Sequence, residues 1–297
     1  MELVHQGNMV EVFKVSERFY FRRANLPLRW QCNGAYIVGD SSVAVVDAPP
    51  QGTAEILAEA ERLFAKPVTA LFLTHAHGDH FFGLPEYLET GAAGRLTVYC
   101  SRRVIDTLAP ELRNSPLSFV GVDGSLTLCF SGGIDLELFC PQDPMHSKWD
   151  MFVHIKEPGL ICAGDAVVEY QNAYFHNADI HAWILGVRRL AERNVKWVLP
   201  GHGPELFPPS YIADFAHHLS SLEMAAKECL ERLRKPAGEN EKSRPLDTGT
   251  AEIADLVEKY FAERGALARE IQERVGDKDA RREVRMVLWE MLRELIR

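Results

Sequence analysis

The sequence predicts an α/β fold in which sheet forms the interior and helices cover it. Short runs rich in valine, isoleucine, leucine and phenylalanine recur through the first two hundred residues, at lengths typical of buried strands. Segments with a 3.6-residue apolar period lie between some of these runs, as expected for helices packed outside a sheet. Of the 297 residues, 46% are hydrophobic and 25% are charged, which is an ordinary globular composition.

The strands and the first helices can be placed in order along the chain. Predicted strands cover residues 35–39, 43–48, 68–74, 96–100, 126–130, 135–140, 151–155, 160–164 and 195–201. The first two strands should form a hairpin, because GDSS between them consists of good turn-forming residues. Predicted helices cover residues 54–65, with Thr53 as the N-terminal cap, and residues 180–194.

After about residue 210 the pattern becomes helical. SYIADFAHHLSSLEMAAKECLERLR predicts one long amphipathic helix, and the polar residues from about 235 to 250 predict a linker. Apolar residues with the 3.6-residue period then predict two or three more helices. We therefore expect a main domain over residues 1–210 and a helical extension over residues 211–297. The apolar faces of the extension are expected to pack on the main domain or on each other, and they are also candidates for a roof over a site or a homodimer interface.

Composition and charge exclude several classes of protein. The formal net charge of −9 argues against a nucleic-acid partner, since such proteins usually present a basic face. The six cysteines show no CxxC pair, which favours reduced thiols over a disulfide framework. The N-terminal residues lack the basic and apolar segments of a secretory signal, and no apolar run approaches membrane-spanning length. We therefore expect a cytoplasmic protein without a membrane partner.

Side chains that bind metals are concentrated directly after one of the predicted strands. The stretch LFLTHAHGDHFFG places three histidines and an aspartate within six positions. His75 and His77 should project to the same side of an extended segment, and Gly78 permits a turn that brings Asp79 and His80 inward. Imidazoles with a carboxylate suit zinc, with iron or manganese possible. Four ligands this close together suit two neighbouring ions better than one.

Three further candidates also follow predicted strands. His146 comes after a strand and a proline-rich loop, Asp165 ends LICAGD, and His202 lies between glycines in VLPGHG. The ends of strands in α/β sheets are the usual location of ligand sites. His154, which lies inside the strand 151–155, is an alternative to His146 as a ligand.

Together these residues resemble a known family. The order HAHGDH, then His146, then Asp165 in AGDAV, then His202 in LPGHG, is similar to that of the metallo-β-lactamase superfamily, and the resemblance covers about residues 8 to 210. It implies a four-layer αββα sandwich with a metal site at one edge, so that residues 1–210 would be the catalytic domain and the C-terminal helices an extension. It also implies that Asp47 lies near the floor of the site.

The resemblance further implies the roles of the ligands. His75, His77 and His146 would hold one ion, Asp79, His80 and His202 would hold the second, and Asp165 would bridge the two. One departure concerns His146, because many hydrolases of this family have a glycine before the middle histidine and this chain has Met145.

The function implied is that of a binuclear metallohydrolase acting on a small-molecule ester, thioester, lactone or related bond. Two divalent ions, in the first place Zn²⁺, would lower the pKa of a shared water molecule from about 15.7 towards 7, and Asp79 would help to orient the nucleophile. Two alternatives stay open: a mononuclear iron dioxygenase similar to persulfide dioxygenases, and a phosphodiesterase or nuclease of the same fold. The candidate substrate contacts are Trp30, Lys148, Tyr170, Tyr174 and His176.

Overall fold

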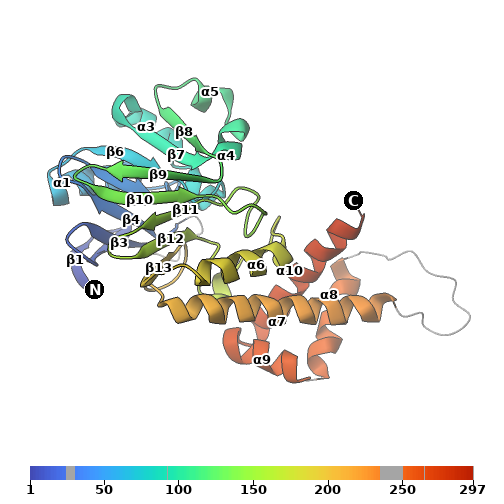
Figure 1. Ribbon diagram of the computed structural model, residues 1–297. Coiled ribbons are helices and arrows are strands. Elements are labelled where there is room, and N and C mark those ends of the chain that lie inside the picture. Colours follow the sequence, from blue (N-terminus) through green and yellow to red (C-terminus); the bar gives the residue numbers. More distant parts are fainter. Residues whose placement is uncertain (25–30, 92, 235–249, 264, 297) are drawn as a thin grey trace, which may run out of the picture.

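Two β-sheets lie face to face and helices cover their outer sides (Figure 1). The structure is a computed structural model, and it describes residues 1–24, 31–91, 93–234, 250–263 and 265–296. The predicted four-layer α/β fold with C-terminal helices is confirmed.

The first sheet contains eight strands in chain order. They are β1 (Glu2–Gln6), β2 (Val10–Lys14), β3 (Phe19–Ala24), β4 (Gly34–Val38), β5 (Val43–Val46), β6 (Val68–Phe72), β7 (Thr97–Ser101) and β8 (Ser118–Val122). Pairing is antiparallel from β1 to β5 and parallel from β5 to β8. The predicted hairpin is present, and its turn is closed by a 2.9 Å bond from Gly39 N to Ser42 O. Strands β1, β2, β3 and β8 were not predicted, because their apolar runs are short and mixed with polar residues.

The second sheet contains five strands in the order β13-β12-β11-β10-β9. They are β9 (Ser125–Phe130), β10 (Ile134–Phe139), β11 (Phe152–Ile155), β12 (Leu160–Gly164) and β13 (Trp197–Pro200). All pairs are antiparallel except β12 with β13, which are parallel. Each of these strands lies within a residue or two of its predicted bounds.

Short helices cover the outer side of the first sheet. They are α1 (Thr53–Phe64), α2 (Gly78–Phe81), α3 (Leu84–Glu89), α4 (Arg102–Thr107), α5 (Pro110–Arg113) and the 3₁₀ turn η1 (Ala93–Arg95). The prediction that Thr53 caps α1 is wrong. Gly52, with a φ of 97°, is the N-cap residue, and the backbone N–H of Thr53 donates instead to the carboxylate of Glu86 at 3.1 Å.

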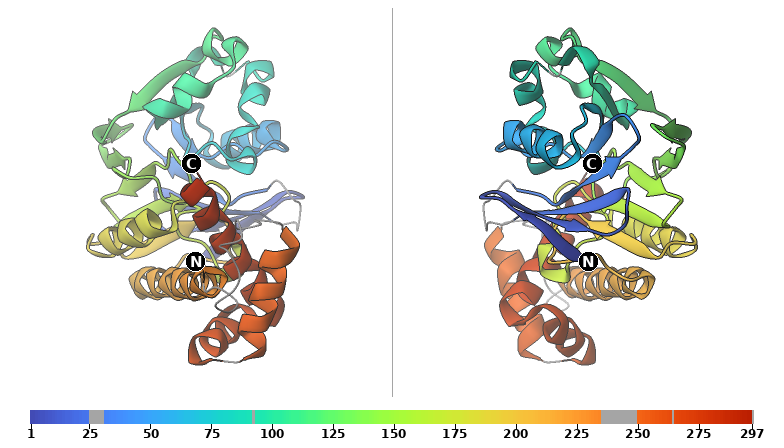
Figure 2. Two further views of the ribbon diagram at one scale, coloured as in Figure 1. Left: turned by 90° about the vertical axis from the view of Figure 1, so that its right-hand side faces the viewer. Right: turned by 90° about the vertical axis from the view of Figure 1, so that its left-hand side faces the viewer.

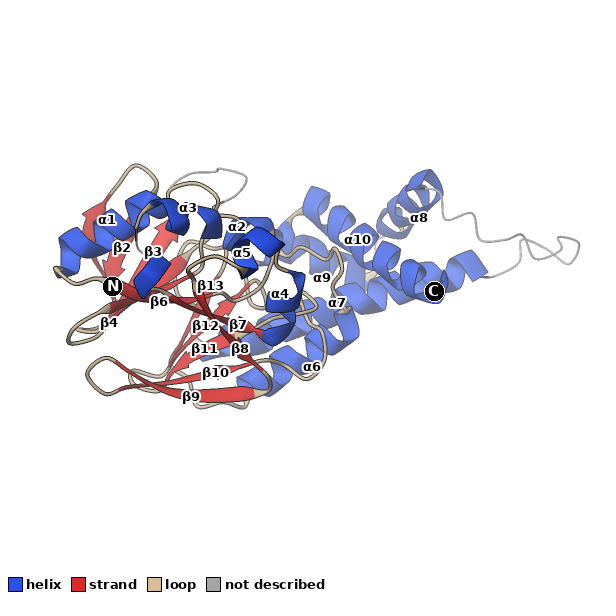
Figure 3. Cartoon of the chain, turned by 90° about the horizontal axis from the view of Figure 1, so that it is seen from above, coloured by secondary structure: helices blue, strands red, loops and turns tan. Residues whose placement is uncertain are grey.

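Helices also cover the second sheet and continue beyond it (Figures 2 and 3). They are α6 (Ile180–Ala191), α7 (Pro209–Arg234), α8 (Thr250–Ala262), α9 (Ala266–Val275) and α10 (Asp277–Ile296), and the 3₁₀ turn η2 (Tyr170–Asn172) precedes them. The apolar period predicted α6 and α7, and it predicted two or three further helices where the structure has α8, α9 and α10. The predicted linker, residues 235–249, lies outside the described residues.

The core has three parts that follow from these layers. One part lies between the sheets, where Phe21, Val46 and Val153 are buried. A second lies between the first sheet and helices α1, α3 and α4. The third begins at the outer face of the second sheet and continues through α6 and α7 into α8, α9 and α10. The helical extension therefore shares one hydrophobic core with the second sheet.

A buried polar pair connects α7 with α10. His218 Nε2 lies 3.1 Å from Glu283 Oε2, and both side chains are completely buried. Burial lowers the pKa of His218 to about 3 and raises the pKa of Glu283 to about 8. Burial therefore favours the uncharged form of both groups.

The structure also answers two questions raised by the sequence, whether the cysteines are paired and whether a helix could span a membrane. None of the six cysteines forms a disulfide, and Cys32, Cys100, Cys162 and Cys229 are buried. In the part of the chain that the structure describes, no helix combines the length and the apolar character needed to cross a lipid bilayer.

Candidate metal centre

The predicted ligands meet at one edge of the sandwich, and they come from both sheets. β6 of the first sheet leads into the segment from His75 to His80, in which His77 is the N-cap residue of the short helix α2. The second sheet supplies His146 from the loop between β10 and β11, Asp165 directly after β12, and His202 just after β13. The site therefore lies at the strand ends, where the loops of both sheets converge.

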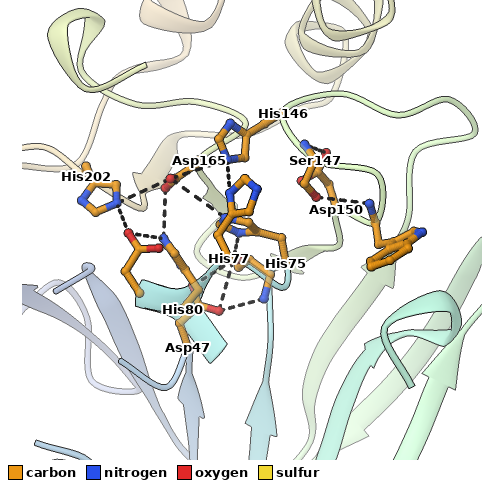
Figure 4. Close-up of polar contacts among 12 residues, drawn as sticks. Asp47, His75, His77, His80, His146, Ser147, Asp150, Asp165 and His202 are labelled. Atoms are coloured by element: carbon orange, nitrogen blue, oxygen red, sulfur yellow. Dashed lines mark hydrogen bonds and ion pairs between the residues drawn. The ribbon is translucent and has the colours of Figure 1, made fainter. Parts of the chain in front are cut away.

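The seven side chains form two adjoining groups. His75, His77 and His146 make up one, Asp79, His80, Asp165 and His202 make up the other, and within each group the candidate ligand atoms lie within 4.8 Å of one another. His146 Nε2 lies 2.9 Å from His77 Nδ1, and His202 Nε2 lies 2.9 Å from Asp79 Oδ2. Figure 4 shows His77, His146 and Asp165 pointing toward one another.

Asp165 lies between the two groups. Its carboxylate oxygens are 3.1 Å from His80 Nε2, 3.5 Å from His202 Nε2, 3.7 Å from His146 Nε2 and 4.0 Å from His75 Nε2. A side chain that faces histidines of both groups is placed to bridge two cations.

Two glycines make this close packing possible. A Cβ atom on Gly201 would lie only 2.0 Å from Asp165 Oδ1, and one on Gly164 would lie 2.5 Å from Thr74 Oγ1. Gly164 also has a positive φ of 51°, a conformation that glycine adopts without steric cost. Any side chain at either position would displace the strand ends that carry Asp165 and His202.

Asp47 supports the centre from behind, as the resemblance implied. It is buried in the left-handed region with a φ of 62°, and its carboxylate accepts bonds from Thr74 N at 2.8 Å and Thr74 Oγ1 at 2.9 Å. The same carboxylate lies 2.7 Å from His80 Nδ1. This contact fixes the imidazole and leaves Nε2 to face Asp165, which is the arrangement by which a second carboxylate orients a metal-binding histidine.

The two groups differ electrostatically. Burial lowers the pKa of His75 well below its ordinary value and that of His146 to about 3, so both imidazoles are neutral, which is the form that binds a metal. In the second group burial opposes ionisation of Asp165, but His202 and His80 outweigh it and hold the pKa well below its usual range. Asp165 and Asp79 in turn raise the pKa of His202 to about 10 against the effect of burial.

The donor set fits divalent metal ions. His75 Nε2 is completely buried, points into the centre and makes no hydrogen bond with any described residue. An unsatisfied buried nitrogen of this kind costs about 1–3 kcal/mol, and a cation bound there would remove that cost. Imidazole nitrogens with carboxylate oxygens match zinc, and iron and manganese accept the same ligands.

The packing of the loop that carries His146 explains how the chain accommodates Met145 at the position where many hydrolases of the family have glycine. Met145 is buried against α6 at Gly186, where a Cβ atom would lie 2.3 Å from the Met145 sulfur. The absence of a side chain on Gly186 therefore accommodates the larger residue before His146. The alternative ligand His154 is not in either group. It lies in β11, with Nδ1 3.6 Å from Glu137 Oε2.

The candidate substrate contacts lie at different places. Tyr174 is 47% exposed, and its ring centroid lies 6.0 Å from that of His77. His176 lies next to Tyr174, while Tyr170 stacks on Tyr211 of α7. Lys148 is exposed and lines a separate surface hollow of about 300 Å³. Trp30 lies outside the described residues.

Other residues of the site were not predicted. Asn33, which is buried, donates from Nδ2 to Gly203 O at 2.9 Å, and its N–H donates to Gly201 O at 2.7 Å, so it holds the chain on both sides of His202. Trp183 packs its ring 5.1 Å from that of His146 and donates from Nε1 to a buried carbonyl at 2.8 Å. These roles depend on contacts between distant segments, and nothing in the local sequence indicates them.

Two curated proteins are similar to this chain in sequence. Ribonuclease Z of Lactobacillus acidophilus is 28% identical over 143 residues, which are 44% of this chain and 37% of that protein. Metallo-beta-lactamase type 2 of Bacillus cereus is 25% identical over 180 residues, which are 58% of this chain and 66% of that protein. The chain thus spans less than two thirds of the length of these relatives.

Comparison with a solved structure and with a family model gives the fold and the family. The metallo-beta-lactamase from Pontibacter korlensis has the same fold, with a TM-score of 0.60, 21% sequence identity, and coverage of 71% of this chain and 99% of that one. The model of the metallo-beta-lactamase superfamily matches residues 28–202, more than half of this chain. The chain belongs to the metallo-beta-lactamase superfamily.

Proposed function

We propose that the protein is a binuclear metal-dependent hydrolase of a small ester, thioester, lactone or related bond. The observation that carries the proposal is the position of Asp165, which faces histidines of both ligand groups across the edge of the sandwich. His75, His77 and His146 would hold one ion, and Asp79, His80 and His202 would hold the other, with Asp165 shared.

The ligand chemistry favours zinc, because imidazoles outnumber carboxylates in the set. When bound, two such cations supply Lewis acidity that lowers the pKa of water towards 7 and stabilises a developing oxyanion. The protein contributes the fixed positions of the ligands, which are held by Asp47, Asn33 and the close backbone contacts at Gly164 and Gly201.

The exposed side of the centre indicates where a substrate would approach. His75, His80 and His146 are buried, whereas His77, Asp79 and His202 are partly exposed. Asp79 accepts a hydrogen bond from His202 through Oδ2, at 2.9 Å. Its carboxylate is therefore held at the open side, where it can accept a proton from an attacking water and orient that water toward the scissile carbonyl.

The proposal can be tested with purified protein. Metal analysis should give two equivalents of a divalent ion per chain. A panel of chromogenic esters, thioesters, lactones, a cephalosporin and a phosphodiester should identify a carbonyl substrate, and Asp79→Ala should lower its kcat/KM by about a hundredfold or more. Asp135→Ala, a change on the exposed face of β10, is the matched control and should retain activity. Full activity of Asp79→Ala would contradict the proposed role of this carboxylate.

The likeness to a ribonuclease Z supports a second candidate, a phosphodiesterase that uses the same centre. The phosphodiester in the panel separates the two candidates. Turnover of the phosphodiester, with no carbonyl substrate cleaved, would favour the second candidate over the first.

A further inference from the structure

A hollow of about 320 Å³ lies between the loop after β12 and two helices of the extension. This volume is within the range of small-molecule sites, which extends from about 300 to 1,000 Å³. The loop contributes Tyr174 and His176, α8 contributes Ile253, and α10 contributes Arg285, Met286 and Trp289.

The walls of the hollow are mainly apolar and already in place. Ile253 is buried and Met286 and Trp289 are half-buried, so an apolar group that entered would meet carbon and sulfur atoms on several sides. Two contacts hold the loop against α10. His176 Nδ1 lies 3.5 Å from Glu290 Oε1, and Arg282 donates from Nη2 to Gln171 O at 2.9 Å.

The hollow adjoins the metal centre. Tyr174 lines the hollow, and the same ring contacts His77 edge-on with a centroid distance of 6.0 Å. Because His77 belongs to the partly exposed side of the centre, a molecule whose reacting bond lies at the metals can extend past Tyr174 toward α10.

The charge of the hollow selects among possible occupants. Arg285 is exposed at its rim, and within the described ranges it has neither an ion pair nor a hydrogen bond. The neighbouring arginines on α10, Arg281 and Arg282, by contrast form ion pairs with acidic residues. Glu290, the acidic group of the lining, is already paired with Arg293 at 3.0 Å. The hollow therefore offers an apolar surface with one uncompensated cation.

We propose that this hollow binds the acyl arm of the substrate, and that the arm is apolar and carries an anionic group that pairs with Arg285. The inference rests on the proposed hydrolase function, and it narrows the substrate class to esters or thioesters of medium-length acids with a second acidic group. The helices of the extension would then determine specificity.

Two experiments test the inference. The first measures kcat/KM for p-nitrophenyl acetate, p-nitrophenyl octanoate and the p-nitrophenyl monoester of octanedioic acid. Met286→Trp fills the hollow. It should lower the ratio of kcat/KM for the octanoate ester to kcat/KM for the acetate ester by about tenfold or more. Met224→Trp, at a methionine that is 54% exposed on α7, is the matched control and should leave the ratio unchanged. Arg285→Gln should reduce the preference for the octanedioic monoester by about three- to fivefold, the range expected for an exposed ion pair, whereas Arg189→Gln on α6 should not.

The second experiment does not depend on catalysis. Isothermal titration calorimetry with octanoate should detect binding to the wild type and to Met224→Trp, and binding should be about tenfold weaker or lost in Met286→Trp. If no ester is hydrolysed but this pattern of binding is found, the hydrolase proposal fails and the hollow is supported as a binding site. If esters are hydrolysed with the same chain-length preference in wild type and Met286→Trp, the inference is overturned while the hydrolase proposal stands. Equal binding of octanoate by both methionine variants would also overturn it.

Discussion

Replacement of Glu283 by glutamine should change how the stability of the protein depends on pH. The folded chain keeps Glu283 protonated up to a pKa of about 8, because its carboxyl group is completely buried beside His218. In the unfolded chain the group ionises near its ordinary value of 4.5. Between these values the folded state binds more protons than the unfolded state, so the free energy of unfolding must fall as pH rises.

The magnitude follows from the size of the pKa difference. Each unit of pH within the window changes the free energy of unfolding by up to about 1.4 kcal/mol. From pH 5 to pH 7 we therefore expect the wild type to lose about 2 kcal/mol through this group. The glutamine of Glu283→Gln has a similar shape and can still donate to His218 Nε2, but it does not titrate. The free energy of unfolding of the variant, relative to that of the wild type, should therefore rise by this amount from pH 5 to pH 7. His218 acts in the opposite direction at lower pH, since its pKa of about 3 gives stability that is lost as pH falls below 6.5, and this effect is common to both proteins.

The assay is urea unfolding of both proteins at pH 5, 6, 7 and 8. The difference in free energy between variant and wild type should increase steadily across the series. Glu273→Gln, at an exposed position on α9, is the control and should show a constant difference. A constant difference for Glu283→Gln as well would refute the conclusion that the buried acid is protonated in the folded state.

Three further substitutions test the support of the metal centre. Gly201→Ala should lower hydrolysis by about a hundredfold or more, because its Cβ atom would lie 2.0 Å from Asp165 Oδ1 and must displace that carboxylate. Asp47→Ala should weaken metal binding by about ten- to a hundredfold in a chelator competition, since it removes the 2.7 Å contact that orients His80. Trp183→Phe should reduce the free energy of unfolding in urea by about 1–3 kcal/mol, because it leaves a buried carbonyl without its donor.

For each of these three predictions, one measured result would contradict the reasoning. For the glycine, Gly94→Ala is the matched control, because a Cβ atom there meets no atom within 4 Å, and equal activity of the two variants would disprove the steric argument. Unchanged metal affinity in Asp47→Ala would show that His80 needs no second carboxylate. A Trp183→Phe variant as stable as the wild type would mean that the indole hydrogen bond contributes nothing to folding.

Much of the fold could be predicted because apolar periodicity reports which face of an element is buried. The long helix α7 and the strands of the second sheet carry this pattern clearly. Strands β1 to β3 do not, since they lie toward the edge of the first sheet and mix polar with apolar residues. The cap of α1 was also mispredicted, because the carboxylate that satisfies its first N–H comes from Glu86, on another helix.

In the candidate site, too, some residues could be predicted from the sequence and others could not. HAHGDH could be found because its residues are close in sequence, and the other ligands because each follows a strand. The contacts that hold them could not, since Asn33, Gly186 and Trp183 act on segments that only the folded chain brings near. The hollow beside Tyr174 depends in addition on where α10 packs, which no local pattern encodes.

The origin of the ligands in two separate sheets has a consequence for the assembly of the protein. Asp79 and His202 are separated by 123 positions in the chain, and His77 and His146 by 69. During synthesis the first sheet therefore emerges with only part of the coordination set, and a complete set exists only after β13 has joined its neighbour. An ion that requires both halves would bind the finished sandwich and no earlier species, so its presence would stabilise the native state by mass action and would mark chains that have completed folding.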